Sequence, residues 1–324
     1  MEWRSESVRK GDYEMKTKLH SLPHLILALV VILLETPGFS VATGVSNKTE
    51  KAYILRSVYV KNQTSEYKVG VNKIIKILTD KGAILSPHGV EKVKSVGIIL
   101  EKTMALKPNG SAEMKVWQIG WRNTDTGKAI PSRIPPLNLN VDKEGVITKA
   151  AELQTIPNVN EIMNAFMIYL PPGMVLFPNK AVKPGDVWTV SIPNPYWNGS
   201  PVEVRSRLVG MERIGGAESL RVSQFYSIPI SYQFDKKGDY SQDSQHAVTS
   251  VVGTVYVSTV NYVQPRSAIL LKRDENVRWE LRFTGLNAVA KSNIKQKSVR
   301  FAASASVHSQ LLKVEEPKAR SRKR

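Results

Sequence analysis

The 324-residue chain contains no cysteine, which excludes disulfide bonds, thiol catalysis and thiolate metal sites. Histidine is also scarce, and the three that follow residue 42, His88, His246 and His308, are widely separated. No His-x-x-x-His pair, nucleophile elbow, phosphate-binding loop or dinucleotide-binding motif occurs. The sequence therefore predicts no catalytic residue, no metal site and no cofactor, and it favours a protein that is not an enzyme.

Acidic residues are few, with 28 Asp and Glu against 46 Lys and Arg, which gives a formal net charge of +18. Residues 313–324 are short of apolar side chains and dense in charge, so we expect a disordered basic tail. Such a tail would bind an anionic membrane or cell-wall surface at about 1 kcal/mol per basic residue. The alternative is that the charge only keeps the protein soluble. The candidate surface-binding residues are Lys318, Arg320, Arg322, Lys323 and Arg324.

Long apolar runs are rare, and the longest is an unbroken stretch of ten apolar residues at 25–34. The positive residues Lys16 and Lys18 precede it, and a small-x-small site follows at residues 40–42. This pattern predicts an N-terminal extension and cleaved signal peptide over residues 1–42, with Met15 as the true start. At about 1.5 Å per residue the run covers only half of a hydrocarbon core, although an uncleaved anchor stays an alternative. We expect an exported protein, periplasmic or extracellular, for which nucleic acid is not an expected partner.

Beyond residue 42, apolar and polar residues alternate with a period of two, which is typical of β-strands. The fold class predicted is mainly β, at the margin of α+β, with two antiparallel β-meanders over residues 43–156 and 174–312. We expect the meanders to form curved or open barrel-like sheets. Tight turns are expected at Asn109-Gly110, at Gly215-Gly216 and over residues 274–276. The predicted strands cover residues 52–60, 67–78, 93–106, 111–121, 137–141, 146–150, 187–192, 202–214, 218–227, 248–263, 267–271, 277–283 and 299–308.

One amphipathic helix is predicted between the meanders, in the connecting segment 157–173. Asn158 is a suitable N-cap, and Met163, Phe166 and Met167 fall on one face at helical spacing. The functional interpretation is a ligand-facing helix with adaptable side chains. The alternative is a helix that seals one face of a sheet.

Aromatic residues make up 7% of the chain, and two arrangements of them stand out. Tyr196 and Trp197 lie in a loop with two prolines, where their rings would bind a sugar or a membrane interface or fold back over the sheet edge. Trp117 and Trp121, four residues apart in one predicted strand, are expected on the same face of the sheet.

The segment Val182-Lys183-Pro184-Gly185-Asp186-Val187-Trp188 resembles a stretch of uncharacterised secreted bacterial β-rich families of unknown function. The hairpin at residues 106–112 is similar to one in the first half of such families. The resemblance implies an antiparallel β protein of the bacterial envelope and assigns no site residues. The segment also fits a type II turn at Pro184-Gly185, with Asp186 bonded to the local backbone and Trp188 in the core.

Taken together, these features predict an exported, non-enzymatic envelope protein that binds an apolar or amphipathic ligand, such as a lipid or glycan, or an anionic envelope surface. Two other classes stay open. One is a hydrolase that acts on envelope glycan or ester, because paired carboxylates come from distant strands. The other is a structural or interaction module without a small-molecule ligand. The oligomeric state is not predicted.

Overall fold

The computed structural model describes residues 51–79, 81–84, 90–130, 136–150, 175–193, 200–233, 250–284 and 298–315. Contacts divide the chain into residues 1–49 and 50–324, and all the described residues belong to the second unit. They form strands and turns without a helix. Accordingly, no helical segment in this part of the chain is long and apolar enough to cross a bilayer. The helix predicted within residues 157–173 lies outside the described residues.

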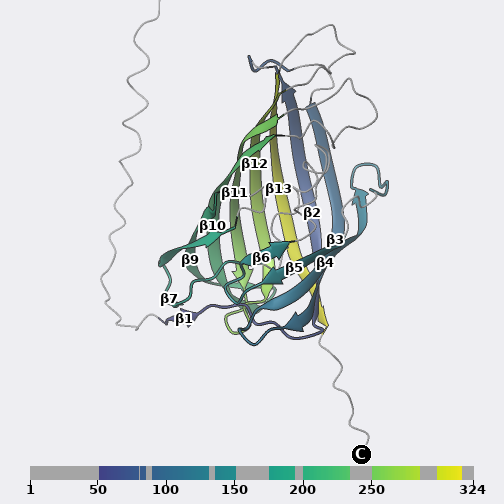
Figure 1. Ribbon diagram of the computed structural model, residues 1–324. Helices are drawn as coiled ribbons and strands as arrows, with labels where there is room; N and C mark the ends of the chain where they lie inside the picture. The colour runs from purple at the N-terminus through teal and green to yellow at the C-terminus, as the bar shows by residue number, and fades with distance from the viewer. Residues whose placement is uncertain are drawn as a thin grey trace, which may run out of the picture. The chain divides into compact units, whose positions relative to one another are not determined.

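Eleven strands form one antiparallel sheet in the order β6-β5-β4-β3-β2-β13-β12-β11-β10-β9-β8, curved into a nearly closed barrel (Figure 1). The prediction of a mainly β, curved fold is confirmed. The two predicted meanders share this single sheet, because β2 and β13 pair along their length, for example Gly70 with His308. The strands are β2 (Thr64–Leu78), β3 (Val90–Leu106), β4 (Ala112–Asn123), β5 (Leu137–Val141), β6 (Ile147–Ala150), β8 (Val187–Ile192), β9 (Val202–Ile214), β10 (Ala217–Gln233), β11 (Ser250–Val263), β12 (Leu270–Thr284) and β13 (Ser298–Glu315).

The face of this sheet that carries the buried side chains is called the inner face here, and the opposite one the outer face. In β9, for example, Val202, Val204, Ser206 and Leu208 are buried and the residues between them are exposed. The same alternation runs through β13, where Phe301, Ala303 and Ala305 are buried, as the sequence predicted. Burial of apolar side chains on the inner face drives the folding of the sheet.

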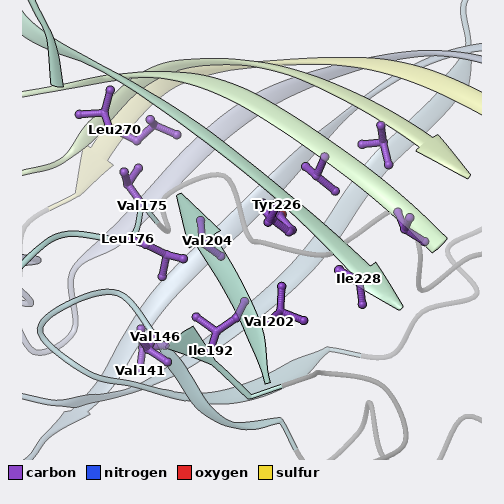
Figure 2. Packing of buried hydrophobic residues seen from close by; sticks show 14 of the residues in the cluster. Val141, Val146, Val175, Leu176, Ile192, Val202, Val204, Tyr226, Ile228 and Leu270 are labelled. Atoms are coloured by element: carbon purple, nitrogen blue, oxygen red, sulfur yellow. The ribbon is translucent and has the colours of Figure 1, made fainter. Parts of the chain in front are cut away.

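The two edge strands, β6 and β8, are connected through the fully buried segment 175–177 (Figure 2). On the β6 side, the Phe177 amide donates a hydrogen bond of 2.9 Å to the Glu144 carbonyl in the β5–β6 turn. On the β8 side, Trp188 Nε1 donates to the Leu176 carbonyl at 3.4 Å. This segment therefore links the two edges at the end of the sheet where the β5–β6 turn lies.

A second, two-stranded sheet lies at this same turn. It pairs β1 (Tyr53–Ile54) with β7 (Ala181–Val182). The residues that follow β1 also reach the β5–β6 turn, since the Ser57 amide donates to the Lys143 carbonyl at 2.8 Å. The predicted strand over residues 52–60 is therefore much shorter than expected, because beyond Ile54 it forms no strand pairing with the described residues and the Ser57 amide bonds to a turn instead.

The predicted tight turns are confirmed except for one. Gly110 adopts a φ of 82°, and Gly215 and Gly216 adopt 57° and 85° in the β9–β10 hairpin. In the segment 182–188, Gly185 has a φ of 93°, and the Lys183 amide donates to Asp186 Oδ2 at 2.8 Å. These residues form the predicted turn and lead into the buried Trp188.

The turn predicted over residues 274–276 is wrong, because β12 passes through them without interruption. Asp274 lies on the outer face and accepts from Lys272 and His308, both at 2.8 Å. Glu275 lies on the inner face beside Arg273 and pairs in register with Thr259. Residues 274–276 pair with β11 on one side and with β13 on the other, so the run Asp-Glu-Asn remains extended.

The two tryptophans of β4 also differ from the prediction, because they lie on opposite faces. Gly120 has a φ of 62°, and the register of β3 against β4 shifts between Val96 and Ile98. Beyond this bulge the alternation reverses, so Trp121 packs against the core while Trp117 pairs with the outer-face residue Leu100.

Candidate functional site: the inner face of the sheet

The inner face between β9 and β13 carries a continuous apolar surface. Its side chains come from five neighbouring strands, and each is at most 9% exposed. The rings of Phe283 and Phe301 meet edge to face with centroids 6.2 Å apart. Representative residues, one or two from each strand, are Val204, Ile228, Val255, Leu281, Phe301 and Ala303.

Three polar groups on the inner face are buried without a hydrogen-bond partner among the described residues. They are Trp121 Nε1 on β4, Tyr226 Oη on β10 and Trp279 Nε1 on β12. A buried donor without a partner costs about 1–3 kcal/mol, and native structures contain few of them. Each of the three can therefore donate to an acceptor atom of a bound molecule.

A hydrogen-bonded polar cluster lies toward the segment 175–177. The guanidinium of Arg273 is 1% exposed, and its Nε donates to Asn261 Oδ1 at 2.7 Å. Asn261 Nδ2 donates to Gln224 Oε1 at 3.1 Å, and Gln224 Nε2 donates to Ser206 Oγ at 2.9 Å. Gln224 Nε2 also donates to the Leu176 carbonyl at 3.1 Å. The cluster thus ties β9 to β12 and to the buried segment, which makes this end of the inner face rigid.

Ionisable groups lie between this cluster and the apolar surface. Burial raises the pKa of Glu275, against the opposing effect of the Arg273 charge. Burial also raises the pKa of the Tyr226 hydroxyl, and the charge of Glu275 adds to that effect. On β2, burial lowers the pKa of Lys73, which Glu91 partly offsets. The inner face therefore combines apolar surface with a few hydrogen-bonding groups, which are the components of a binding site for an amphipathic molecule.

The site residues predicted from the sequence lie outside the described residues. Met163, Phe166 and Met167 fall within 151–174, and Tyr196 and Trp197 fall within 194–199. The basic residues of the tail fall within 316–324, whereas residues 313–315 of the predicted tail belong to β13. All these site assignments stay predictions.

Sequence reasoning missed the inner-face residues Arg273, Glu275, Tyr226 and Trp279. The alternation of the strand could have revealed two of them, because Arg273 and Glu275 occupy the same alternate positions as Val277 and Trp279. Polar residues in phase with buried ones indicate buried hydrogen bonding. Among the described residues, no three acidic or histidine side chains gather as a metal site.

Comparisons with known proteins give matches among solved structures alone. No family model matches the chain, and no curated protein matches it significantly. Among solved structures, a lipovitellin structure titled for lipid–protein interactions matches at 11% identity, with a TM-score of 0.38, over 82% of this chain and 26% of that one. A DUF1329 family protein from Desulfovibrio piger matches at 8% identity, with a TM-score of 0.24, over 81% of this chain and 88% of that one. The outer membrane protein OpdK from Pseudomonas aeruginosa matches at 8% identity, with a TM-score of 0.17, over 78% and 99%. Because identities and TM-scores this low carry no information on function, only the residues of this chain can indicate its function.

Proposed function

We propose that this chain is an exported, non-enzymatic protein of the bacterial envelope that holds an amphipathic ligand against the inner face of its sheet. The observation that carries the proposal is the set of unpartnered donors, Trp121 Nε1, Tyr226 Oη and Trp279 Nε1, buried beside an apolar surface. Export is inferred from the leader in residues 1–42. The envelope is inferred from this leader and from the resemblance at residues 182–188.

The chemistry of the inner face defines the class of ligand. The apolar side chains favour a ligand with a hydrocarbon part, because contact between apolar surfaces removes both from water and lowers the free energy. The three donors favour a ligand that also carries acceptor oxygens, such as those of an ester, carboxylate or phosphate group. A lipid satisfies both conditions, because its oxygens would supply acceptors that the described residues do not provide.

The first experiment is native mass spectrometry of the protein purified from its own envelope, followed by extraction of the bound material with organic solvent. We expect a lipid in stoichiometric amount. Protein that carries no lipid and does not bind cis-parinaric acid would contradict the proposal.

A second experiment tests the donors directly with the variants Tyr226→Phe and Trp279→Phe. Each variant keeps an apolar ring and removes a donor that has no partner in the described residues. The free energy of unfolding should therefore stay the same or rise for Tyr226→Phe, and fall for Trp279→Phe because the smaller ring leaves a cavity. The affinity for cis-parinaric acid should fall about tenfold for each donor that the probe uses. Loss of stability without loss of binding would mean that these groups have a structural role.

A further inference from the structure

The outer face carries a trough that runs across the strands and is separate from the proposed ligand site. One recess of about 510 Å³ lies over β3, β2, β13, β12 and β11. A second of about 410 Å³ lies over β8 to β12. Both are lined by Phe225, Ser258 and Asn276, so the two recesses are parts of one trough.

The trough follows an unbroken row of residues in register across seven strands. From β9 to β3 the register partners are Arg205, Phe225, Ser258, Asn276, Ser306, Asn72 and Lys94. Six strand spacings of about 4.8 Å give the row a length of roughly 29 Å. The middle of the row consists of small polar side chains, and Ser306 Oγ donates to Asn276 Oδ1 at 3.0 Å. The occupant of such a trough has to be a narrow, extended molecule.

The trough carries more basic than acidic side chains. Among the outer-face residues that line its larger recess, Lys92, Lys94 and Arg278 are basic and none is acidic. Lys94 pairs with Asp125 and Arg278 with Glu280, whereas Lys92 has no such partner in the part of the chain that the structure describes. The smaller recess is lined by two arginines and by Asp274, whose charge is already balanced by Lys272 and His308. Within the described residues, Lys92, Arg205 and Arg207 have no acidic partner within ion-pair distance. Positive charge that is not neutralised within the sheet favours an anionic occupant.

The remaining side chains distinguish between anionic polymers. Hydroxyl and amide groups at Ser258, Ser304 and Asn276 suit the hydroxyl groups of a sugar chain. Phe225 is 55% exposed at the junction of the two recesses, where its ring can stack on one sugar ring. Single-stranded nucleic acid is bound by a series of exposed rings, one for each base, whereas this row contains one. A membrane surface is flat and would not enter a recess.

We propose that the outer-face trough binds a linear acidic polysaccharide that lies across the strands from β9 to β3. The lysines and arginines pair with its carboxylate or sulfate groups, the serine and asparagine side chains bond to its hydroxyls, and Phe225 stacks on a sugar ring. This site is independent of the amphipathic ligand proposed for the inner face.

The test uses isothermal titration calorimetry with a size-fractionated oligogalacturonate as the probe. The trough variant carries Lys92→Gln, Arg205→Gln and Arg207→Gln, all at exposed positions. The matched control carries Lys68→Gln, Lys76→Gln and Arg300→Gln, which are exposed on the outer face, do not line the trough and remove the same charge. We expect binding that weakens with salt, a loss of about tenfold or more in the trough variant, and less than about twofold in the control. Phe225→Ser should also weaken binding without altering the fold, as judged by circular dichroism.

Several outcomes would overturn the proposal. One is that the trough and control variants lose the same affinity for oligogalacturonate. The others are that the trough variant binds it as tightly as the natural chain does, or that the natural chain does not bind it at all. Tighter binding of oligothymidylate or of phosphatidylglycerol vesicles through Lys92, Arg205 and Arg207 would assign the trough to nucleic acid or to a membrane instead. Binding of cis-parinaric acid to the inner face should be unchanged in the trough variant, which separates this test from that of the proposed function.

Discussion

Arg273 Nε donates a hydrogen bond of 2.7 Å to Asn261 Oδ1 on the neighbouring strand, and both side chains are at most 1% exposed. The bond holds a positive charge inside the sheet next to Glu275, which is half-buried on the same face. The pair joins β11 and β12 to the polar cluster that reaches the segment 175–177. This end of the inner face is therefore organised by hydrogen bonds, in contrast to the apolar surface beyond it.

The first prediction concerns Arg273→Met. The substitution keeps the bulk but leaves the Asn261 amide oxygen without its donor, so we expect a loss of about 3–5 kcal/mol in the free energy of unfolding. Chemical denaturation monitored by tryptophan fluorescence measures the change. Arg300→Met on the exposed outer face is the control and should stay within about 0.5 kcal/mol of the natural chain. A loss as small as that of the control would mean that the buried cluster adds little stability.

The second prediction concerns the close approach of Trp121 to Gly97. A Cβ at residue 97 would lie 2.5 Å from the Trp121 ring, whereas a Cβ at Gly70 would meet no atom within 4 Å. Gly97→Ala should therefore lower the free energy of unfolding by about 1–3 kcal/mol, and Gly70→Ala should leave it unchanged or raise it slightly. Thermal unfolding of the two variants measures the difference. Equal midpoints would contradict the packing of Trp121 against β3.

The third prediction concerns pH. Burial raises the pKa of Glu275 in the folded state, so folding favours its neutral form. The free energy of unfolding should then fall as the pH rises from the ordinary carboxyl range through the raised value. Glu275→Gln should remove this dependence and raise stability at neutral pH.

Urea titrations at a series of pH values from about 4 to about 8 measure this effect. Glu113→Gln, at an exposed position of β4, is the control and should retain the pH dependence of the natural chain. If stability instead rose over this range and Glu275→Gln abolished the rise, the direction inferred for Glu275 would be wrong.

The fourth prediction compares neighbouring alanines on β13. Ala303 lies on the inner face and is 6% exposed, whereas Ala302 lies on the outer face. If the inner face holds a ligand, Ala303→Trp fills space that the ligand occupies, so binding of cis-parinaric acid should be lost while the protein stays folded. Ala302→Trp should bind the probe as the natural chain does. Unfolding of Ala303→Trp would instead indicate a solid core, in which an added ring overpacks at a cost of about 1–3 kcal/mol or more.

Strand positions were predictable where alternation and turn residues agree. The predicted strands 187–192 and 202–214 match β8 and β9, and the Gly215-Gly216 hairpin follows from residues that tolerate a positive φ. The turn expected over residues 274–276 was wrong, because these residues pair with β11 on one side and with β13 on the other, and β13 lies in another part of the chain. The candidate inner-face site was largely missed for the same reason, since Trp121, Tyr226 and Trp279 come from strands far apart in the sequence.

By itself, the sequence determined the β class, most strand positions and the side of each strand that is buried, because alternation and turn chemistry act over a few neighbouring residues. Only the tertiary structure decided that β2 pairs with β13, that residues 175–177 link the two edge strands, and that three unpartnered donors lie on one face of the sheet. These features depend on contacts between residues distant in the chain, and local patterns do not encode which distant strands become neighbours.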